Sequence, residues 1–267
     1  MPTRVITITS GKGGVGKTTT TANLGVALSE LGNRVVVIDA DIGLRNLDVV
    51  MGLQNRIIYD VVDLVEGRCR LRQALIRDRA TLELYLLPAA QSRDKTAISP
   101  ADMVRVCEQL RGACDFILID SPAGIETGFR NAIAGADEFV LITTPDASSV
   151  QDVDRVLGIL ENEGHRNLSL IINRIRPELV QRGEMLSPAE VLRTLAIDLI
   201  GIIPETEAIL VSNNQGAPIA RDTGSLPGRA YANAARRLLG QKVGFMPILE
   251  GKKSVWERFS SFFRGHS

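Results

Sequence analysis

The chain has 267 residues, 45% of them hydrophobic, so it is long enough to bury a sizeable core. Its 31 lysines and arginines balance its 31 aspartates and glutamates. This neutral charge excludes a global field that would draw the protein onto nucleic acid, so any anionic partner must be met by a local patch.

Short, nearly continuous apolar runs predict the sheet. They lie at 5–8, 35–38, 82–87, 116–119, 139–143, 168–172 and 199–203. Such runs are typical of parallel strands buried on both faces, and the segments of helical periodicity between them supply the crossovers. Two of these segments, SPAD at 99–102 and SPAE at 187–190, carry complete helix-start signals. We predict an α/β fold with a doubly wound, mostly parallel sheet flanked by helices.

The connection after the first run carries the strongest motif. Residues 10–19 read SGKGGVGKTT, between the run at 5–8 and a helical run at 20–31. Residues 11–18 fit G-x-x-x-x-G-K-[ST], the phosphate loop in which backbone N–H groups surround the phosphates and the lysine reaches the terminal ones. The helix N-terminus adds positive charge. The predicted nucleotide-binding residues are Gly11, Lys12, Gly13, Gly14, Val15, Gly16, Lys17, Thr18 and Thr19.

The same glycines also fit a dinucleotide-binding pattern. They read G-x-G-x-x-G, and Asp39 lies about where such a fold places its ribose-binding acid. Lys17 and Thr18 favour a nucleoside triphosphate, because a pyrophosphate bound by backbone alone needs neither an ammonium group nor a hydroxyl on magnesium.

Acidic residues lie where two of the predicted strands end. Asp120 directly follows the run at 116–119, and Asp39 and Asp41 follow the run at 35–38. A carboxylate at the first position can hold magnesium beside Thr18, although residues of this type also serve as caps and turn formers. The connection IGLRNLD at 42–48 is a place where a mobile switch could respond to the γ-phosphate.

Two motifs together resemble those of a known family. GKGGVGKTT, with its second lysine Lys12, and DSPAGIE at 120–126 are similar to the deviant phosphate loop and second switch of the MinD and ParA group of ATPases. The resemblance implies that Lys12 reaches across a nucleotide-sandwich homodimer to the partner's phosphates. It also implies that Asp41 orients the attacking water, with Lys17 stabilising phosphoryl charge, and that Asp39 supports the magnesium ion.

The resemblance extends to the base and to protein partners. It implies that Asn173 and Pro204, at two further strand ends, grip adenine, although the sequence does not exclude GTP. The segment 148–155 is predicted to start a capped helix. In the resembled family this helix, including Asp152 and Asp154, receives a MinC-like division inhibitor and a MinE-like activator.

The C-terminal segment predicts a second unit, residues 251–267, after an ATPase domain at 1–250. Aromatic and apolar residues fall on one face of a helix there and charged residues largely on the other. The alternative is a terminal helix packed on its own domain. We predict membrane binding by Lys252, Lys253, Val255, Trp256, Arg258, Phe259, Phe262, Phe263 and Arg264.

Compartment signals agree with a cytosolic protein. Cys69, Cys107 and Cys114 are scattered without C-x-x-C spacing, which argues for a reducing compartment and against a zinc site. The chain has no basic-then-apolar leader and no apolar run long enough to span a bilayer. We expect reversible attachment to the cytoplasmic face of the plasma membrane.

The expected activity is Mg²⁺-dependent ATP hydrolysis by a dimer that binds anionic membrane in its ATP state and positions the bacterial division septum. Three alternatives share the nucleotide chemistry. A ParA-type DNA-partitioning ATPase would need a basic surface for DNA, which the charge disfavours, so we expect no nucleic acid partner. An iron-protein electron carrier would need cysteines placed to bridge a cluster. A flagellar-number or polar-positioning regulator would also use a membrane tail.

Overall fold

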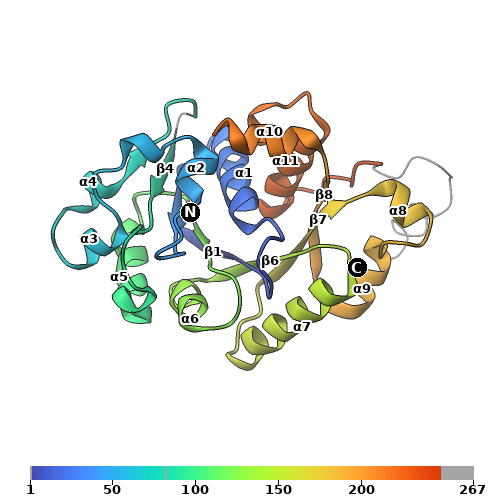
Figure 1. The fold of residues 1–267 in the computed structure, drawn as a ribbon, viewed down its shortest axis with the longest axis horizontal. Coiled ribbons are helices and arrows are strands. Elements are labelled where there is room, and N and C mark those ends of the chain that lie inside the picture. Colours follow the sequence, from blue (N-terminus) through green and yellow to red (C-terminus); the bar gives the residue numbers. More distant parts are fainter. Residues whose placement is uncertain (1, 82, 248–267) are drawn as a thin grey trace.

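The computed structural model describes residues 2–81 and 83–247 (Figure 1). In these residues one sheet has the strand order β3-β4-β2-β5-β1-β6-β7-β8. The strands are β1 (Arg4–Thr9), β2 (Val35–Asp39), β3 (Ile76–Arg77), β4 (Leu84–Leu87), β5 (Phe116–Asp120), β6 (Glu138–Thr143), β7 (Leu168–Ile175) and β8 (Asp198–Pro204). All neighbours are parallel except β3 and β4. The predicted sheet is confirmed. Sequence patterns missed β3, because two residues are too few to show a period.

Helices cover both faces of this sheet. In Figure 1, α1, α2, α10 and α11 lie on one face, and α5, α6, α7 and α9 lie on the other. The helices are α1 (Lys17–Glu30), α2 (Leu47–Met51), α3 (Val61–Val65), α4 (Leu71–Ala74), α5 (Pro100–Leu110), α6 (Thr127–Ile133), α7 (Ala147–Asn162), α8 (Pro177–Gln181), α9 (Pro188–Leu195), α10 (Glu207–Asn214) and α11 (Leu226–Leu238). Short 3₁₀ turns are η1 (Gln54–Arg56), η2 (Lys95–Ala97) and η3 (Ile219–Arg221).

Successive side chains of a strand pack alternately against the helices on the two faces of the sheet. Ile6 and Ile8 share a core cluster with Leu24 of α1 and Tyr231 of α11. Val5, directly before Ile6, packs in the cluster that contains Val106 of α5. Because the strands are buried on both faces, their sequences are continuously apolar rather than alternating.

The helix-start signals have the expected geometry. Ser99 and Ser187 are the N-caps of α5 and α9, and each forms a capping box with the acid three residues later. α7 is capped by Asp146, whose carboxylate accepts a hydrogen bond from the Ser149 N–H. This helix therefore begins at Ala147, just before the predicted segment 148–155.

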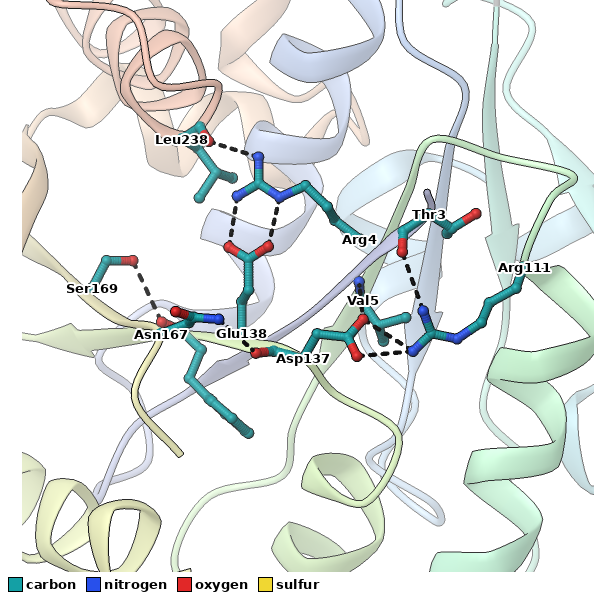
Figure 2. Close-up of polar contacts among 10 residues, drawn as sticks. Thr3, Arg4, Val5, Arg111, Asp137, Glu138, Asn167, Ser169 and Leu238 are labelled. Carbon is teal, nitrogen blue, oxygen red and sulfur yellow. Dashed lines mark hydrogen bonds and ion pairs between the residues drawn. The ribbon is translucent and has the colours of Figure 1, made fainter. Parts of the chain in front are cut away.

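Two arginines brace the amino edge of the sheet (Figure 2). Arg4, at the start of β1, donates to both carboxylate oxygens of Glu138 at 2.5 and 2.6 Å, and to the Leu238 carbonyl at 2.8 Å. Arg111 donates to both oxygens of Asp137 at 2.9 and 3.0 Å. Bidentate pairs of this kind fix the register of the groups that they join. They tie β1, β6, α5 and the end of α11 together at this edge.

The predicted membrane-binding residues between Lys252 and Arg264 lie outside the described residues. Within residues 2–81 and 83–247, none of the helices has both the length and the apolarity needed to cross a bilayer.

Candidate functional site

The candidate site lies at the carboxyl edge of the sheet, where β1, β2 and β5 end side by side. β1 is central in the strand order, and the loop at 10–16 leads from it directly into α1. In the strand register Asp120 lies opposite Ile8 on one side and opposite Asp39 on the other. The parallel sheet thus brings the phosphate loop and both predicted strand-end acids to one place, as expected for ligand sites in this architecture.

Glycine is required in the loop for two different reasons. Gly14 and Gly16 have φ values of 77° and 97°, a region that other residues rarely adopt. A Cβ on Gly16 would also lie 2.3 Å from the amide nitrogen of Asn173. Gly16 is the N-cap of α1, so this backbone directs the helix N-terminus toward the loop, where an anion is favoured.

Lys17 is held inside the loop. Only 7% of the residue is exposed. Its ammonium group donates to Ser10 Oγ at 3.1 Å and to the Lys12 carbonyl at 3.4 Å. Burial lowers the pKa of Lys17, and the charges of Asp120 and Asp41 act in the opposite direction. A buried ammonium group among neutral oxygens and carboxylates is well placed to receive phosphate oxygens.

The carboxylates of Asp39 and Asp120 are both buried, with 1% and 2% of each residue exposed. Burial, reinforced by the charge of Asp120, raises the pKa of Asp39 to about 8, although three backbone N–H groups donate to its carboxylate. Burial raises the pKa of Asp120 to about 6 against hydrogen bonds from Thr18 and Thr21 and the charge of Lys17. Two adjacent buried acids favour a shared proton or a bound cation.

The donor set suits magnesium. Carboxylate oxygens of Asp39 and Asp120 and the Thr18 hydroxyl are hard oxygen donors, and Mg²⁺ is usually held by one or two carboxylates together with substrate phosphates. No group of three or more His, Cys, Asp or Glu side chains able to hold a metal occurs within residues 2–81 and 83–247. A tightly bound all-protein metal cage is therefore absent from this part of the chain, whereas a nucleotide-dependent Mg²⁺ site fits.

Asp41 lies in the connection between β2 and α2, two residues after β2 ends. Its N–H donates to Asp39 at 3.0 Å, and its charge opposes the effect of burial, which lowers the pKa of Lys17. Farther along the connection, Arg45 and Asp48 form an ion pair at 2.8 Å, with Asp48 buried. The predicted switch segment is therefore tied to the end of β2, where the Asp41, Asn46 and Leu47 N–H groups donate to Asp39, and to itself at its far end.

The second lysine of the motif points away from Lys17. Lys12 is exposed, and its ammonium group donates to Ser148 Oγ on α7 at 3.2 Å. Behind it, a Cβ on Gly11 would lie 2.3 Å from the Asp152 carbonyl oxygen, so the loop backbone rests directly on α7. Asp152 is half-buried there, whereas Asp154 is exposed. Of the two predicted partner-binding acids, only Asp152 is in contact with the phosphate loop.

Asn173 and Pro204, the predicted adenine residues, are both buried. Pro204 is the last residue of β8 as predicted, whereas Asn173 lies within β7, two residues before that strand ends at Ile175. The amide nitrogen of Asn173 donates to the Val15 carbonyl at 2.8 Å, and its oxygen accepts from the Arg174 N–H at 2.9 Å. Arg174 has a φ of 56°, an uncommon conformation for a residue with a side chain. The geometry therefore gives Asn173 a contact with the loop itself, in addition to any role at the base.

Sequence reasoning missed three polar residues around the loop. Ser10 accepts from Lys17 and donates to the Lys12 carbonyl at 2.7 Å. Thr21 donates to Asp120 at 3.3 Å, and Asn213 of α10 donates to Thr19 Oγ1 at 3.0 Å. Ser10 and Thr21 flank the motif, so their position was a usable signal. Nothing in the sequence near Asn213 indicates that α10 packs against the start of α1.

Comparisons with known proteins agree with this geometry. The model of the CobQ/CobB/MinD/ParA nucleotide binding domain matches residues 6–219. The septum site-determining protein MinD of Bacillus subtilis is 49% identical over 262 residues, covering 97% of each chain. MinD in the MinC:MinD cell division protein complex of Aquifex aeolicus has a TM-score of 0.85 and 46% identity, covering 91% of this chain and 98% of that one.

A third relative was solved with a nucleotide. The septum site-determining protein MinD of Pyrococcus horikoshii, complexed with Mg-ADP, has a TM-score of 0.80 and 30% identity, covering 88% of this chain and 96% of that one. Identity of about one half over nearly full length, together with the match to the nucleotide-binding domain, establishes the relationship. The chain belongs to the MinD family of septum site-determining proteins.

Proposed function

We propose that the chain is an ATPase that dimerises when it binds ATP, associates with anionic membrane and positions the bacterial division septum by recruiting a MinC-like inhibitor. One observation carries the nucleotide chemistry: the loop holds buried Lys17 beside the paired acids Asp39 and Asp120. The similarity to MinD in a MinC:MinD complex supports the division role.

Each group of site residues has a separate role in the proposed ATP hydrolysis. Loop N–H groups and the ammonium group of Lys17 stabilise charge on the phosphoryl oxygens, which is the main requirement of phosphoryl transfer. Asp41 orients the attacking water from the end of β2. Magnesium, held by Thr18, Asp39 and Asp120, would neutralise phosphate charge. Asn173 and Pro204 would border the base.

Lys12 acts in the partner subunit. Its ammonium group is exposed at the surface of the loop rather than enclosed within it, so a second subunit facing this surface can receive it. A cation supplied in trans makes hydrolysis depend on dimerisation, as an arginine finger does. Slow turnover by the monomer and faster turnover by the dimer follow from this arrangement.

The membrane and partner contacts complete the cycle. The tail at 251–267 supplies weak, reversible membrane affinity, which pairing in a dimer raises by roughly 10² to 10⁴. Asp152 and Asp154 on α7 receive the inhibitor and the MinE-like activator. The Asp152 backbone touches Gly11, so an activator bound to α7 at Asp152 would sit directly behind the phosphate loop.

The decisive experiment measures oligomeric state, phosphate release and vesicle binding of the full chain in ATP and in ADP. We expect a dimer in ATP only, co-sedimentation with phosphatidylglycerol-containing vesicles that is far stronger in ATP than in ADP, and loss of the dimer and of this ATP effect in Lys17→Ala. Lys12→Ala should bind ATP but lose stimulated turnover. Binding to duplex DNA in place of vesicles would contradict the proposal and favour a partitioning ATPase.

A test of the partner surface should use Asp154, because Asp152 also touches the loop. Asp154→Asn should weaken binding of a MinC-like or MinE-like partner while leaving ATP affinity unchanged. Unaltered affinity for both partners would remove the site from α7.

A further inference from the structure

Arg237, near the end of α11, makes an unusual set of contacts with the segment that follows the helix. Its guanidinium group donates to three backbone carbonyls: Val243 at 2.9 Å, Gly244 at 2.8 Å and Ile200 of β8 at 2.8 Å. It also stacks over the ring of Phe245, 3.9 Å from the centroid. Among the ion pairs of the described residues, none involves Arg237. We call this set of contacts the Arg237 clasp.

The Arg237 clasp is partly buried and belongs to the packed domain rather than to its surface. Arg237 is half-buried, and burial lowers its pKa to about 10, so the group stays charged at neutral pH. Charge-assisted hydrogen bonds to carbonyls and stacking on an aromatic face are each stronger than their neutral equivalents. Beyond the guanidinium group, Phe245 packs against a core cluster that contains Val153 of α7 and Val191 of α9, and Met246 packs against the cluster of α1 and α11. The segment 243–246 is therefore fastened to the domain although it is neither helix nor strand.

The position of the clasp matters because the predicted membrane tail follows it. Ile200 lies in the first half of β8, and the carbonyl of Leu238 accepts from Arg4 at the start of β1 (Figure 2). The phosphate loop, by contrast, follows the last residue of β1. The described chain thus ends near the edge of the sheet where the parallel strands begin, opposite the phosphate loop.

We propose that Arg237 is a positioning residue that fixes the point at which the membrane tail leaves the ATPase domain, so that the two tails of a dimer start from fixed places. This inference rests on the proposed function. With the clasp closed, residues 247–250 connect the last fastened residue to the tail. With it open, that connection begins at residue 241, because the Gly240 N–H still donates to the Arg237 carbonyl at the end of α11, and it gains up to about 21 Å of reach at ~3.5 Å per residue.

The extra length lowers the avidity of a dimer that binds through two tails, and it leaves the membrane affinity of each single tail unchanged. Effective concentration falls roughly as the −3/2 power of the connecting length, so opening the clasp should weaken two-tailed binding about fourfold. Binding through a single tail does not depend on that length. The expected signature is therefore a loss of vesicle affinity in ATP, where the protein is dimeric, with none in ADP.

The test compares full-length Arg237→Gln with Arg236→Gln, which removes the same charge from the exposed neighbour on α11. Trypsin cleavage after exposed Lys242 reports opening, since proteases cut locally released backbone. We expect faster cleavage at Lys242 in Arg237→Gln only, with ATPase activity unchanged in dilute solution. Phosphatidylglycerol-containing vesicles should bind this variant about fourfold more weakly in ATP and equally in ADP.

Phe245→Leu provides a second variant in case Arg237→Gln folds poorly. It keeps the carbonyl bonds and removes the aromatic face, so it should give intermediate cleavage and an intermediate loss of affinity. Unchanged vesicle affinity despite faster cleavage would overturn the positioning role, and unchanged cleavage would overturn the clasp itself. An equal loss in ATP and ADP would indicate a direct membrane contact instead. Failure of the wild-type chain to bind vesicles in ATP would refute the proposed function, while the cleavage comparison would still decide whether Arg237 fastens the segment.

Discussion

At the scale of single residues, the site is defined by charges that the fold holds in a costly environment. Asp39 and Asp120 lie opposite each other in the strand register and are almost fully buried. Burial of two acids side by side disfavours ionisation of both, and raises the pKa of Asp39 to about 8 and that of Asp120 to about 6. A bound cation would remove that cost, so the pair is destabilising on its own.

This pair predicts a pH dependence of stability without magnesium or nucleotide. In the unfolded chain both carboxyls ionise near pH 3.8, whereas the folded protein keeps their protons until about pH 6 and 8. The folded state binds more protons in this window, so stabilisation present below pH 4 is lost as pH rises toward 8. For Asp120 alone, the rise of about two pKa units corresponds to a loss on the order of 3 kcal/mol, and the larger rise for Asp39 adds to it. Denaturant titrations across this range should show the decline, and Asp39→Asn should flatten it. Parallel curves for the two proteins would contradict the assignment.

Asn173 predicts a different effect, on nucleotide affinity. Its amide donates to the Val15 carbonyl, so Asn173→Ala should loosen the phosphate loop whatever the base. Loss of one such bond costs about 0.5–1.5 kcal/mol, or roughly two- to twelvefold in affinity. We expect ATP, ADP and GTP to weaken by the same factor in equilibrium titrations. A loss confined to the adenine nucleotides would show that the amide acts on the base alone.

At the scale of elements, the phosphate loop is supported by helices that belong to other parts of the chain. α7 touches Gly11, α10 reaches Thr19 through Asn213, and the end of β7 contacts Val15. The loop conformation therefore depends on packing contacts distant in sequence. One side of α7 supports the loop, and another side bears the exposed Asp154.

Gly11→Ala tests the support that α7 gives. The new methyl group would lie 2.3 Å from the Asp152 carbonyl oxygen, so either the loop or α7 must move. Overpacking of this kind costs about 1–3 kcal/mol. We expect a lower unfolding temperature and weaker nucleotide binding. Gly13→Ala is the matched control for stability, because its nearest neighbour is Ala123 Cβ at 3.7 Å. Equal unfolding temperatures for the two variants would mean that the loop tolerates displacement from α7.

At the scale of the whole molecule, the sequence predicted what depends on local pattern. Buried strands have continuous apolar runs, and the loop motif combines glycines with Lys17 and Thr18 in a fixed order, so both were visible in the chain. The two-residue β3, the contact of Asn213 with Thr19 and the fastening of Phe245 by Arg237 were not. Each depends on packing between elements far apart in sequence, which no short pattern encodes. The assigned roles of all the predicted site residues, Asp41, Lys12 and Pro204 among them, stay predictions.

Ion pairs that stabilise the fold lie at the amino edge of the sheet, whereas the candidate nucleotide site lies at its carboxyl edge. Mutations at the two edges should therefore have different effects. Arg4 joins Glu138 and the end of α11 at the amino edge, while Lys17 lies beyond the carboxyl edge. Arg4→Gln loses a bidentate, partly buried pair worth about 1–2 kcal/mol, so the unfolding temperature should fall by a few degrees.

Nucleotide affinity should be unchanged in Arg4→Gln, because no contact of Arg4 reaches the loop. Lys17→Ala should lower nucleotide affinity without lowering the unfolding temperature. It removes a desolvated ammonium group, which relieves a burial cost in the empty protein, and it lowers ATP affinity by at least about tenfold. Calorimetry measures the unfolding temperature of each variant, and ATP titration measures the ATP affinity of each. A fall in ATP affinity for Arg4→Gln comparable to that for Lys17→Ala would mean that the sheet transmits strain between its edges and that stability and nucleotide binding are not separable in this fold.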